Sequence, residues 1–473
     1  MQVKMLYAGV MSGSFPQGAE NLHELAERIV PVKDLERLVH RIGEERVAQR
    51  NTQAAEYEAL PLMKKIESPT GVTPTVVSVS LDGGRQQLRS DAIERNDRTA
   101  RANATAQISA AAIPAVTAAD GSACCAGETA APQNHAAIPE ETLSSDEKRE
   151  AGEGHWKNYN AGILQTLTGV ESAVDPCPEI PNCFIDRPHI VKIAAEIHGT
   201  HTPDGGRPFG RQDLELAKLQ TADPQAPVPD PSNSTPPEEP ARRSRRRPGA
   251  PEVLVQSVVA SRQGSAAFAV LLAAAAWARG FFGATRRAFL GDGLRSNWTV
   301  QQRFFPTFTP ILDFIHALTH IYSAATAGQS PEAGWERYVR AISLVWSGNI
   351  GAVLTLMEAW CDEAGPPEPD DPELHPRRVL LAELGYVQNN RERMQYAEYR
   401  RLGLPITTAH MESMVKQINY RVKGSEKFWS ESGAEAILQL RADFLSDTRP
   451  LSAFFRHRQL NATGQRPYHC SKT

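Results

Sequence analysis

Two short segments that lie far apart in the chain constrain its fold more than any other feature. Asp82 follows a run rich in β-branched residues at 75–79, and Asp292 follows the apolar residues 288–290. β-Branched and aromatic residues favour strands, and the glycine after each aspartate lets the backbone turn and gives an anionic ligand room to approach. The sequence therefore predicts two strands that each end in an aspartate, although an aspartate before a glycine is also common in ordinary turns.

A third carboxylate, Glu412, lies in a segment that we expect to be a helix from about 407 to 422. Two aspartates at strand ends and one glutamate on a helix form a usual set of ligands for a pair of Mg²⁺ ions. Mg²⁺ prefers oxygen ligands and keeps several of its waters, so few protein groups suffice. Asp82, Asp292 and Glu412 are therefore the candidate metal-binding residues.

Two long segments, 289–322 and 403–441, resemble the catalytic core of the ISKra-type insertion-sequence transposases. Residues 14–46 and the strand that ends at Asp82 resemble this family more weakly, and all the matches together cover roughly half of the chain. The resemblance implies an α/β fold, with a ribonuclease-H-like catalytic domain that contains a helical insertion. It also implies a small helical segment, similar to a helix-turn-helix, before that domain.

The same resemblance implies a DDE transposase that cleaves DNA and transfers strands at the ends of an insertion sequence. Asp82 would bridge two Mg²⁺ ions, for which Mn²⁺ substitutes, and Asp292 and Glu412 would each complete one metal site and share in catalysis. The partners would be DNA, as terminal inverted repeats and as target, and a second copy of the chain, because two ends must be joined.

The changes in composition along the chain, read with the resemblance, suggest five regions. Proline-rich and periodicity-poor stretches at 220–250 and 100–150 lack the apolar residues needed to fold alone. The regions are a DNA-binding helical segment (1–60), core strands with disordered insertions at 100–150 and 220–250 (70–300), a helical insertion (301–404), a catalytic helix (405–445) and a tail (446–473).

Two groups of basic residues are candidates for contact with DNA. The first lies on the second of two amphipathic helices expected within 18–50, separated at Pro31, and the second lies on and after the helix of Glu412. The residues are Lys33, Arg37 and Arg41 in the first group, and Lys416, Arg421, Lys423 and Lys427 in the second. A plain helical hairpin and a solvated helix face are the alternatives, because charge runs are often only solvated.

Asp313 and His316 are three residues apart, so they share one face of an expected helix. The resemblance implies an accessory role in ordering the site or the DNA, and the alternative is a hydrogen-bonded pair with a structural role. A zinc site is a further alternative, since Cys177 and Cys183 precede His198 and His201. The gap between the two cysteines is wider than zinc sites usually show, which argues against it.

Composition narrows the function without deciding it. The 473 residues carry a formal charge of −4, so affinity for DNA must come from local basic patches. The apolar run 265–278 is shorter than the roughly 20 residues of a membrane span and indicates a buried helix. Its 6 cysteines do not suggest a disulfide framework. We therefore expect no membrane contact and a cytoplasmic protein, and the resemblance implies that it is bacterial and associated with the nucleoid.

Two other interpretations stay open at this point. Family members often carry a longer N-terminal region with paired cysteines, so the chain is interpreted as a shortened copy, and a decayed transposase that binds DNA without cutting it is the alternative function. The other alternative is a helical scaffold whose carboxylates are incidental. Stabilisation by a metal would distinguish the scaffold from the enzyme, because a ligand that binds only the native state raises stability.

Overall fold

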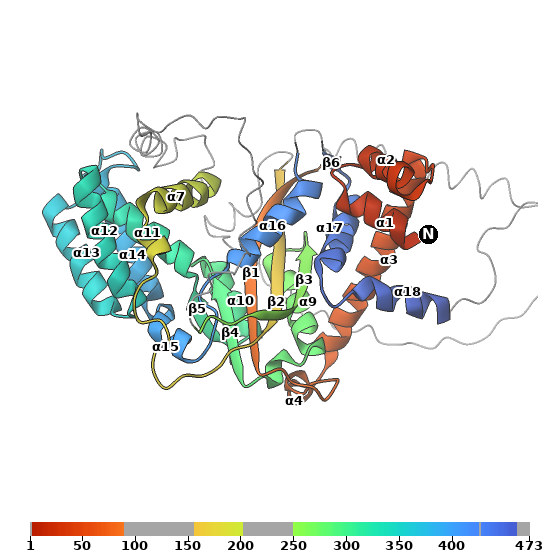
Figure 1. Ribbon diagram of the computed structural model, residues 1–473, viewed down its shortest axis with the longest axis horizontal. Helices are drawn as coiled ribbons and strands as arrows, with labels where there is room; N and C mark the ends of the chain where they lie inside the picture. Colours follow the sequence, from red (N-terminus) through yellow and green to blue (C-terminus); the bar gives the residue numbers. More distant parts are fainter. Residues whose placement is uncertain (1, 89–155, 202–248, 425–426, 461–473) are drawn as a thin grey trace, which may run out of the picture. The chain divides into compact units, whose positions relative to one another are not determined.

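The computed structural model describes residues 2–88, 156–201, 249–424 and 427–460 (Figure 1). The expected loop at 100–150 and almost all of the expected linker at 220–250 lie outside the described residues.

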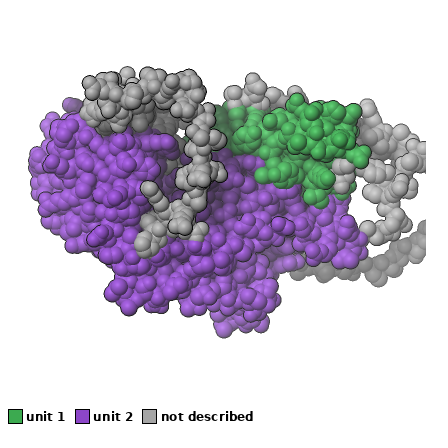
Figure 2. All heavy atoms as spheres, in the orientation of Figure 1, with its two compact units in different colours: residues 1–44, 84–159, 419–438 green, residues 45–83, 160–418, 439–473 purple. Residues whose placement is uncertain are grey.

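The chain forms two compact units, which are coloured separately in Figure 2. Unit 1 comprises Met1–Glu44, Gly84–Tyr159 and Asn419–Leu438, and unit 2 comprises Glu45–Gly83, Asn160–Ile418 and Gln439–Thr473.

The strands within the described residues form one mixed sheet of six strands, which confirms the expected α/β class. The order is β3-β2-β1-β4-β5, and β6 pairs with β1 at Gln87 and Leu88. β1 is parallel to β4, β4 is parallel to β5, and β2 is antiparallel to β3. The strands are β1 (Val76–Leu88), β2 (Trp156–Leu167), β3 (Val253–Ser261), β4 (Arg286–Gly291), β5 (Thr309–Leu312) and β6 (Phe428–Trp429).

The strand that carries Asp82 does not end there, contrary to the expectation. β1 begins where the β-branched run predicts, with Val76, Val77 and Val79 fully buried, but it continues through the two glycines to Leu88. A Cβ atom on Gly84 would lie 2.3 Å from the ring of Tyr159. Glycine therefore serves a close approach between neighbouring segments rather than a turn.

Two helices pack beside the sheet of unit 2. α9 (Ser265–Ala278) contacts β3 and α10 (Arg295–Phe304), and α10 contacts β4. The apolar run 265–278 is thus a buried helix, as expected, with Phe268 and Leu272 nearly inaccessible. None of the helices in the described part of the chain is both long enough and apolar enough to cross a membrane.

The segment 301–404, expected to be a helical insertion, begins with the end of α10 and is mainly helical from residue 314 onward. It also contains β5, which we did not expect. α12 and α14 each pack against both α11 and α13 (Figure 1). The helices are α11 (Phe314–Thr326), α12 (Pro331–Trp346), α13 (Ile350–Ala364), α14 (Pro376–Asn390) and α15 (Tyr396–Arg401), with the 3-10 turn η3 (Arg391–Arg393).

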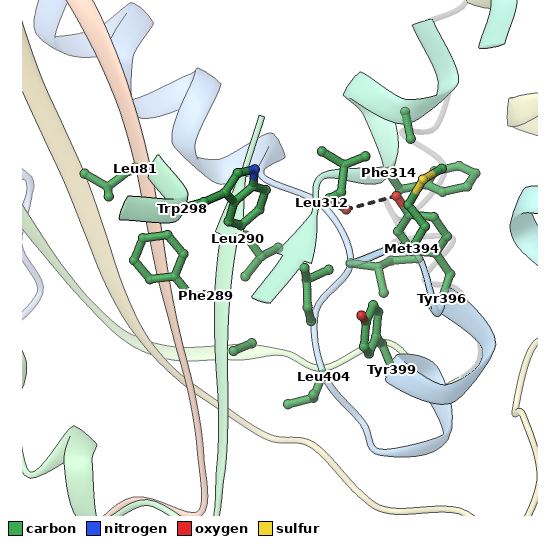
Figure 3. Close-up of a cluster of buried hydrophobic side chains, with 14 of the residues drawn as sticks. Leu81, Phe289, Leu290, Trp298, Leu312, Phe314, Met394, Tyr396, Tyr399 and Leu404 are labelled. Atoms are coloured by element: carbon green, nitrogen blue, oxygen red, sulfur yellow. Dashed lines mark hydrogen bonds between the residues drawn. The ribbon is translucent and has the colours of Figure 1, made fainter. Parts of the chain in front are cut away.

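Aromatic side chains fill the space between the end of β5 and these helices. The ring of Phe314 meets the rings of Trp346 and Tyr396 edge-on, each at 5.1 Å between centroids. The hydroxyl of Tyr396 donates a hydrogen bond of 3.0 Å to the carbonyl oxygen of Leu312 (Figure 3). The helical block, which comprises α11 to α15, is therefore fixed to the end of β5.

The other elements of unit 2 complete its core and cover the edge of its sheet. α7 (Arg187–His201) packs on α11. At the β3 edge the N–H of Asp447 donates to Gln256 O and the N–H of Gln256 donates to Asp447 Oδ2, both at 2.9 Å, so this edge is not open to another strand. Apart from the helices at the start of the chain, the further elements are α4 (Leu62–Ile66), η1 (Asn182–Phe184), η2 (Phe281–Gly283), α16 (Ala409–Val422), α17 (Glu431–Leu445) and α18 (Pro450–Leu460).

Unit 1 begins with α1 (Gln2–Met11), α2 (Phe15–Ala26) and the first part of α3 (Val32–Ala59). The expected break between two helices lies at 27–31, as Pro31 indicated. The apolar face expected on α3, which includes Leu35 and Ile42, is buried. Apolar periodicity also predicts a buried face with Leu25 and Ile29 on the preceding helix, but these side chains are 86% and 87% exposed, and Ile29 lies beyond the end of α2 at Ala26.

Candidate metal centre

Three aspartates lie in a row across neighbouring parallel strands in unit 2. Asp292 and Asp313 directly follow β4 and β5, and Asp82 lies within β1, two residues beyond its last pair with β4. Ser80 of β1 is opposite Leu290 of β4, so Asp82 and Asp292, each two residues further on, are level with each other. Gly291 is opposite Leu312 of β5, which places Asp313 beside Asp292. Since parallel strands lie about 4.8 Å apart, the three side chains start close together. The carboxyl ends of parallel strands are where α/β sheets usually bind ligands.

Glu412 joins this row from α16. Asp313 Oδ1 accepts a 2.6 Å hydrogen bond from the N–H of Thr408, and the N–H of Glu412 donates to the carbonyl oxygen of Thr408. Asp313 therefore anchors the start of the helix that carries Glu412. One ligand atom each from Asp313, His316 and Glu412 lies within 4.8 Å of the other two, which makes them a possible metal-binding group.

The pair Asp313 and His316 forms as expected, at the start of α11. Asp313 is fully buried and caps this helix: its Oδ2 accepts from the N–H of His316 at 3.1 Å and lies 2.7 Å from His316 Nδ1. Burial lowers the pKa of His316, but the hydrogen bond and charge of Asp313, with the charges of Asp292 and Asp82, outweigh this and raise the pKa to about 9. Without a metal, His316 is therefore protonated at neutral pH.

Burial and nearby negative charges raise the pKa values of Asp82 and Glu412. Burial and the charge of Asp292 raise the pKa of Asp82 from 3.8 to about 7, against the N–H of Gly83 and the charge of His316, which lower it. Burial, and then the charge of Asp313, raise the pKa of Glu412. A cluster of buried like charges is costly, and a bound cation relieves that cost.

Asp292 is held by the first turn of the segment that follows it. Its Oδ1 accepts hydrogen bonds from the N–H of Leu294 and from Asn297 Nδ2, both at 2.9 Å. Asn297 lies on α10, so this helix fixes the orientation of the carboxylate.

The donor set fits a hard cation. Asp82, Asp292, Asp313 and Glu412 offer only oxygen ligands, which Mg²⁺ prefers. A divalent ion would also counter the raised pKa values of Asp82 and Glu412. The structure brings Asp82 and Asp292 together as the strands predict. Within the described residues, however, the group that converges to 4.8 Å contains Glu412 with Asp313 and His316 rather than with Asp82 and Asp292.

Sequence reasoning missed the position of Asp313 at the end of a strand. The signal was present, because Ile311 and Leu312 precede this aspartate just as apolar residues precede the other two. We had assigned Asp313 to a helix, and it is instead the last residue before one.

The zinc alternative gains no support from the described residues. Cys177 Sγ donates to the carbonyl oxygen of Glu179, Cys183 is exposed, and neither belongs to the metal-binding group above. The side chains of His198 and His201 lie outside the described residues.

One candidate for DNA contact is buried. Arg421 is 2% exposed, and its guanidinium lies over the rings of Phe15 and Trp429 at 4.4 and 5.0 Å. Its Nε donates to the carbonyl oxygen of Gly9 at 3.1 Å. Arg421 therefore packs unit 1 together, and the expectation that it grips DNA is not compatible with this placement.

The other basic candidates are at the surface, several of them beside acidic or aromatic groups. Each partner is close enough to hold the side chain but leaves it accessible, as surface ion pairs do. The contacts are Lys33 with Glu36 at 3.0 Å, Arg37 with Asp34 at 3.1 Å, Lys416 with Glu196 at 3.5 Å, Lys423 over Trp156 at 5.9 Å and Lys427 with the carbonyl oxygen of Tyr420 at 2.9 Å, while Arg41 is exposed on α3.

Comparisons of the chain with family models, with curated proteins and with solved structures found no match.

Proposed function

We propose that this protein is a metal-dependent DNA transposase of the DDE type, which cleaves DNA at the ends of an insertion sequence and joins them to a target. The observation that carries the proposal is the row of Asp82, Asp292 and Asp313 across three neighbouring parallel strands, with Glu412 on a helix anchored to that row. The family resemblance of 289–322 and 403–441 supplies the reaction class.

The order of elements supports a ribonuclease-H-like catalytic domain. The strands β1, β2 and β3, with α7 before β3, are followed by the buried helix α9, then by β4, α10 and β5. The helices α11 to α15 come next, and then α16, which carries the glutamate. The first and fourth strands are neighbours in the sheet although the chain brings them together from far apart, so their aspartates adjoin. A ribonuclease-H-like site requires that arrangement.

Asp82, Asp292 and Glu412 would hold the metal ions, as the resemblance implies, and Asp313 would add a fourth oxygen donor to the same site. When bound, two Mg²⁺ ions would activate the attacking oxygen and stabilise the leaving oxygen. The chain's own groups do the positioning: Asn297 fixes Asp292, and Asp313 holds both His316 and the start of α16.

DNA would reach this site over exposed basic side chains. Lys416 lies one helical turn after Glu412 on α16 and is 69% exposed, so it can contact a phosphate beside the metal ions. The terminal repeats and the target would be the DNA partners, and a homodimer would join two ends.

Nicking of a duplex that carries the element's terminal repeat tests the proposal. Purified protein would be incubated with labelled duplex and Mg²⁺ or Mn²⁺, beside Asp292→Asn and a matched control, Asp370→Asn, which changes an exposed loop carboxylate. We expect metal-dependent nicks at the repeat boundary from the wild type and the control only.

Each other result selects a different function. DNA binding without nicking in all proteins would indicate a decayed copy. Neither binding nor nicking, together with no stabilisation by metal, would favour a scaffold. Nicking that Asp292→Asn retains would show that another site cuts the DNA.

A further inference from the structure

A group of three side chains from the helical block lies beside Asp292. Glu383 and Tyr386 are one turn apart on α14, so they share a face of that helix. His320 of α11 has its Nδ1 2.5 Å from Glu383 Oε2, and its ring stacks on Tyr386 with 3.5 Å between centroids and 20° between planes. The imidazole of His320 therefore restrains the ring of Tyr386, and the carboxylate of Glu383 in turn restrains that imidazole.

The hydroxyl of Tyr386 reaches the backbone of the candidate catalytic aspartate. It donates a 2.7 Å hydrogen bond to the carbonyl oxygen of Asp292. The next residue, Gly293, has φ of +99°, and a Cβ atom there would lie 2.5 Å from the Tyr386 hydroxyl. Glycine is thus required twice at this position, by the backbone conformation and by the closeness of the phenol.

The carboxylate of Asp292 is held separately, by hydrogen bonds from residues that follow it in the chain. Its Oδ1 accepts from Leu294 and Asn297, whereas no described residue donates a hydrogen bond to Oδ2. One oxygen is therefore occupied by the protein, and the other is left for a ligand. A carboxylate that binds metal needs such second contacts to orient it.

We propose that Tyr386, held by His320 and Glu383, is a positioning residue that fixes the loop of Asp292 so that Oδ2 faces the catalytic cation. The helical block would thus restrain the loop of Asp292 through the hydroxyl of Tyr386. The catalytic meaning of this role rests on the proposed function, but the restraint on the loop does not.

Hydrogen exchange of the backbone amides tests the restraint directly. Tyr386→Phe removes the hydroxyl and keeps the ring, and Tyr338→Phe is the matched control, because the buried Tyr338 hydroxyl donates a 2.9 Å bond to the carbonyl oxygen of Phe184 in the same unit. We expect exchange at Gly293 and Leu294 to become about five to ten times faster in Tyr386→Phe, the factor that one neutral hydrogen bond contributes. Tyr338→Phe should leave these amides unchanged.

Unchanged exchange at 293–294 in Tyr386→Phe, or an equal increase in Tyr338→Phe, would overturn the inference, since a merely structural tyrosine predicts one of these. The second readout is the Mg²⁺ concentration that gives half-maximal nicking, which should rise in Tyr386→Phe and not in the control. If the wild type does not nick but exchange responds as expected, the restraint stands and the proposed function fails. If the wild type nicks while both readouts of Tyr386→Phe match it, the function stands and the inference fails.

Discussion

Replacing Asp82 by asparagine should make the metal-free protein more stable near pH 8, although it removes a metal ligand. Burial and the neighbouring Asp292 raise the pKa of Asp82 from 3.8 to about 7. At about 1.4 kcal/mol per pH unit, this interval corresponds to about 4 kcal/mol. The ionised carboxylate therefore opposes folding by that order of magnitude when no cation is present.

The sign follows from proton binding. Folded Asp82 keeps its proton up to about pH 7, whereas the unfolded chain releases it near the ordinary value of 3.8. Between these limits the folded state binds more protons, so the free energy of unfolding falls as pH rises and then stays low. Asparagine carries no charge, so the variant should lack this loss.

Urea denaturation between pH 4 and 8 measures the effect, with EDTA in one series and Mg²⁺ in another. Mg²⁺ should restore stability to the wild type above pH 7 and should stabilise Asp82→Asn far less, since a ligand raises stability only where it binds. The control is Asp370→Asn, whose carboxylate is exposed. Parallel pH profiles for the wild type and Asp82→Asn, or equal stabilisation of both by Mg²⁺, would refute the reasoning.

Two further predictions concern residues outside the metal centre. Asp175→Asn should lower the free energy of unfolding by about 2 kcal/mol near pH 7. Burial raises the pKa of Asp175, but its hydrogen bonds with Arg400 and the N–H of Cys177 outweigh this and lower the pKa below 3.8. The difference in unfolding free energy between the variant and the wild type should therefore shrink as the pH falls below 3.8. A difference that stays constant in urea titrations across this range would contradict the prediction. Arg421→Ala should cost about 2–4 kcal/mol, because it removes a buried side chain and its hydrogen bond. The folded fraction should keep the salt dependence of its DNA binding, and a shallower salt slope without loss of stability would show that Arg421 contacts phosphate after all.

Local patterns were sufficient to predict several elements. The β-branched run before Asp82, the apolar residues before Asp292 and the apolar stretch 265–278 lie in β1, β4 and α9. The helix of Glu412 also lies where its periodicity indicates. These predictions succeed because hydrophobic periodicity and backbone preference act over a few neighbouring residues.

The failures involve residues whose environment comes from distant parts of the chain. Pro310 interrupts the short β5, and a proline argues against a strand unless that strand lies at the edge of a sheet, as β5 does. The basic pattern on α16 does not reveal that Arg421 is covered by aromatic rings from other segments. Edge position and burial are decided by packing, which a local pattern does not contain.

The sequence by itself determined that Asp82 and Asp292 follow strand-forming residues and that Glu412 lies on a helix, because each of these depends on its immediate neighbours. Only the tertiary structure decided that Asp82, Asp292 and Asp313 lie side by side, that Asp313 anchors the helix of Glu412, and that Tyr386 reaches the backbone of Asp292. Strand order and register depend on hydrogen bonds and buried contacts between residues up to a few hundred positions apart, so they are properties of the folded chain as a whole.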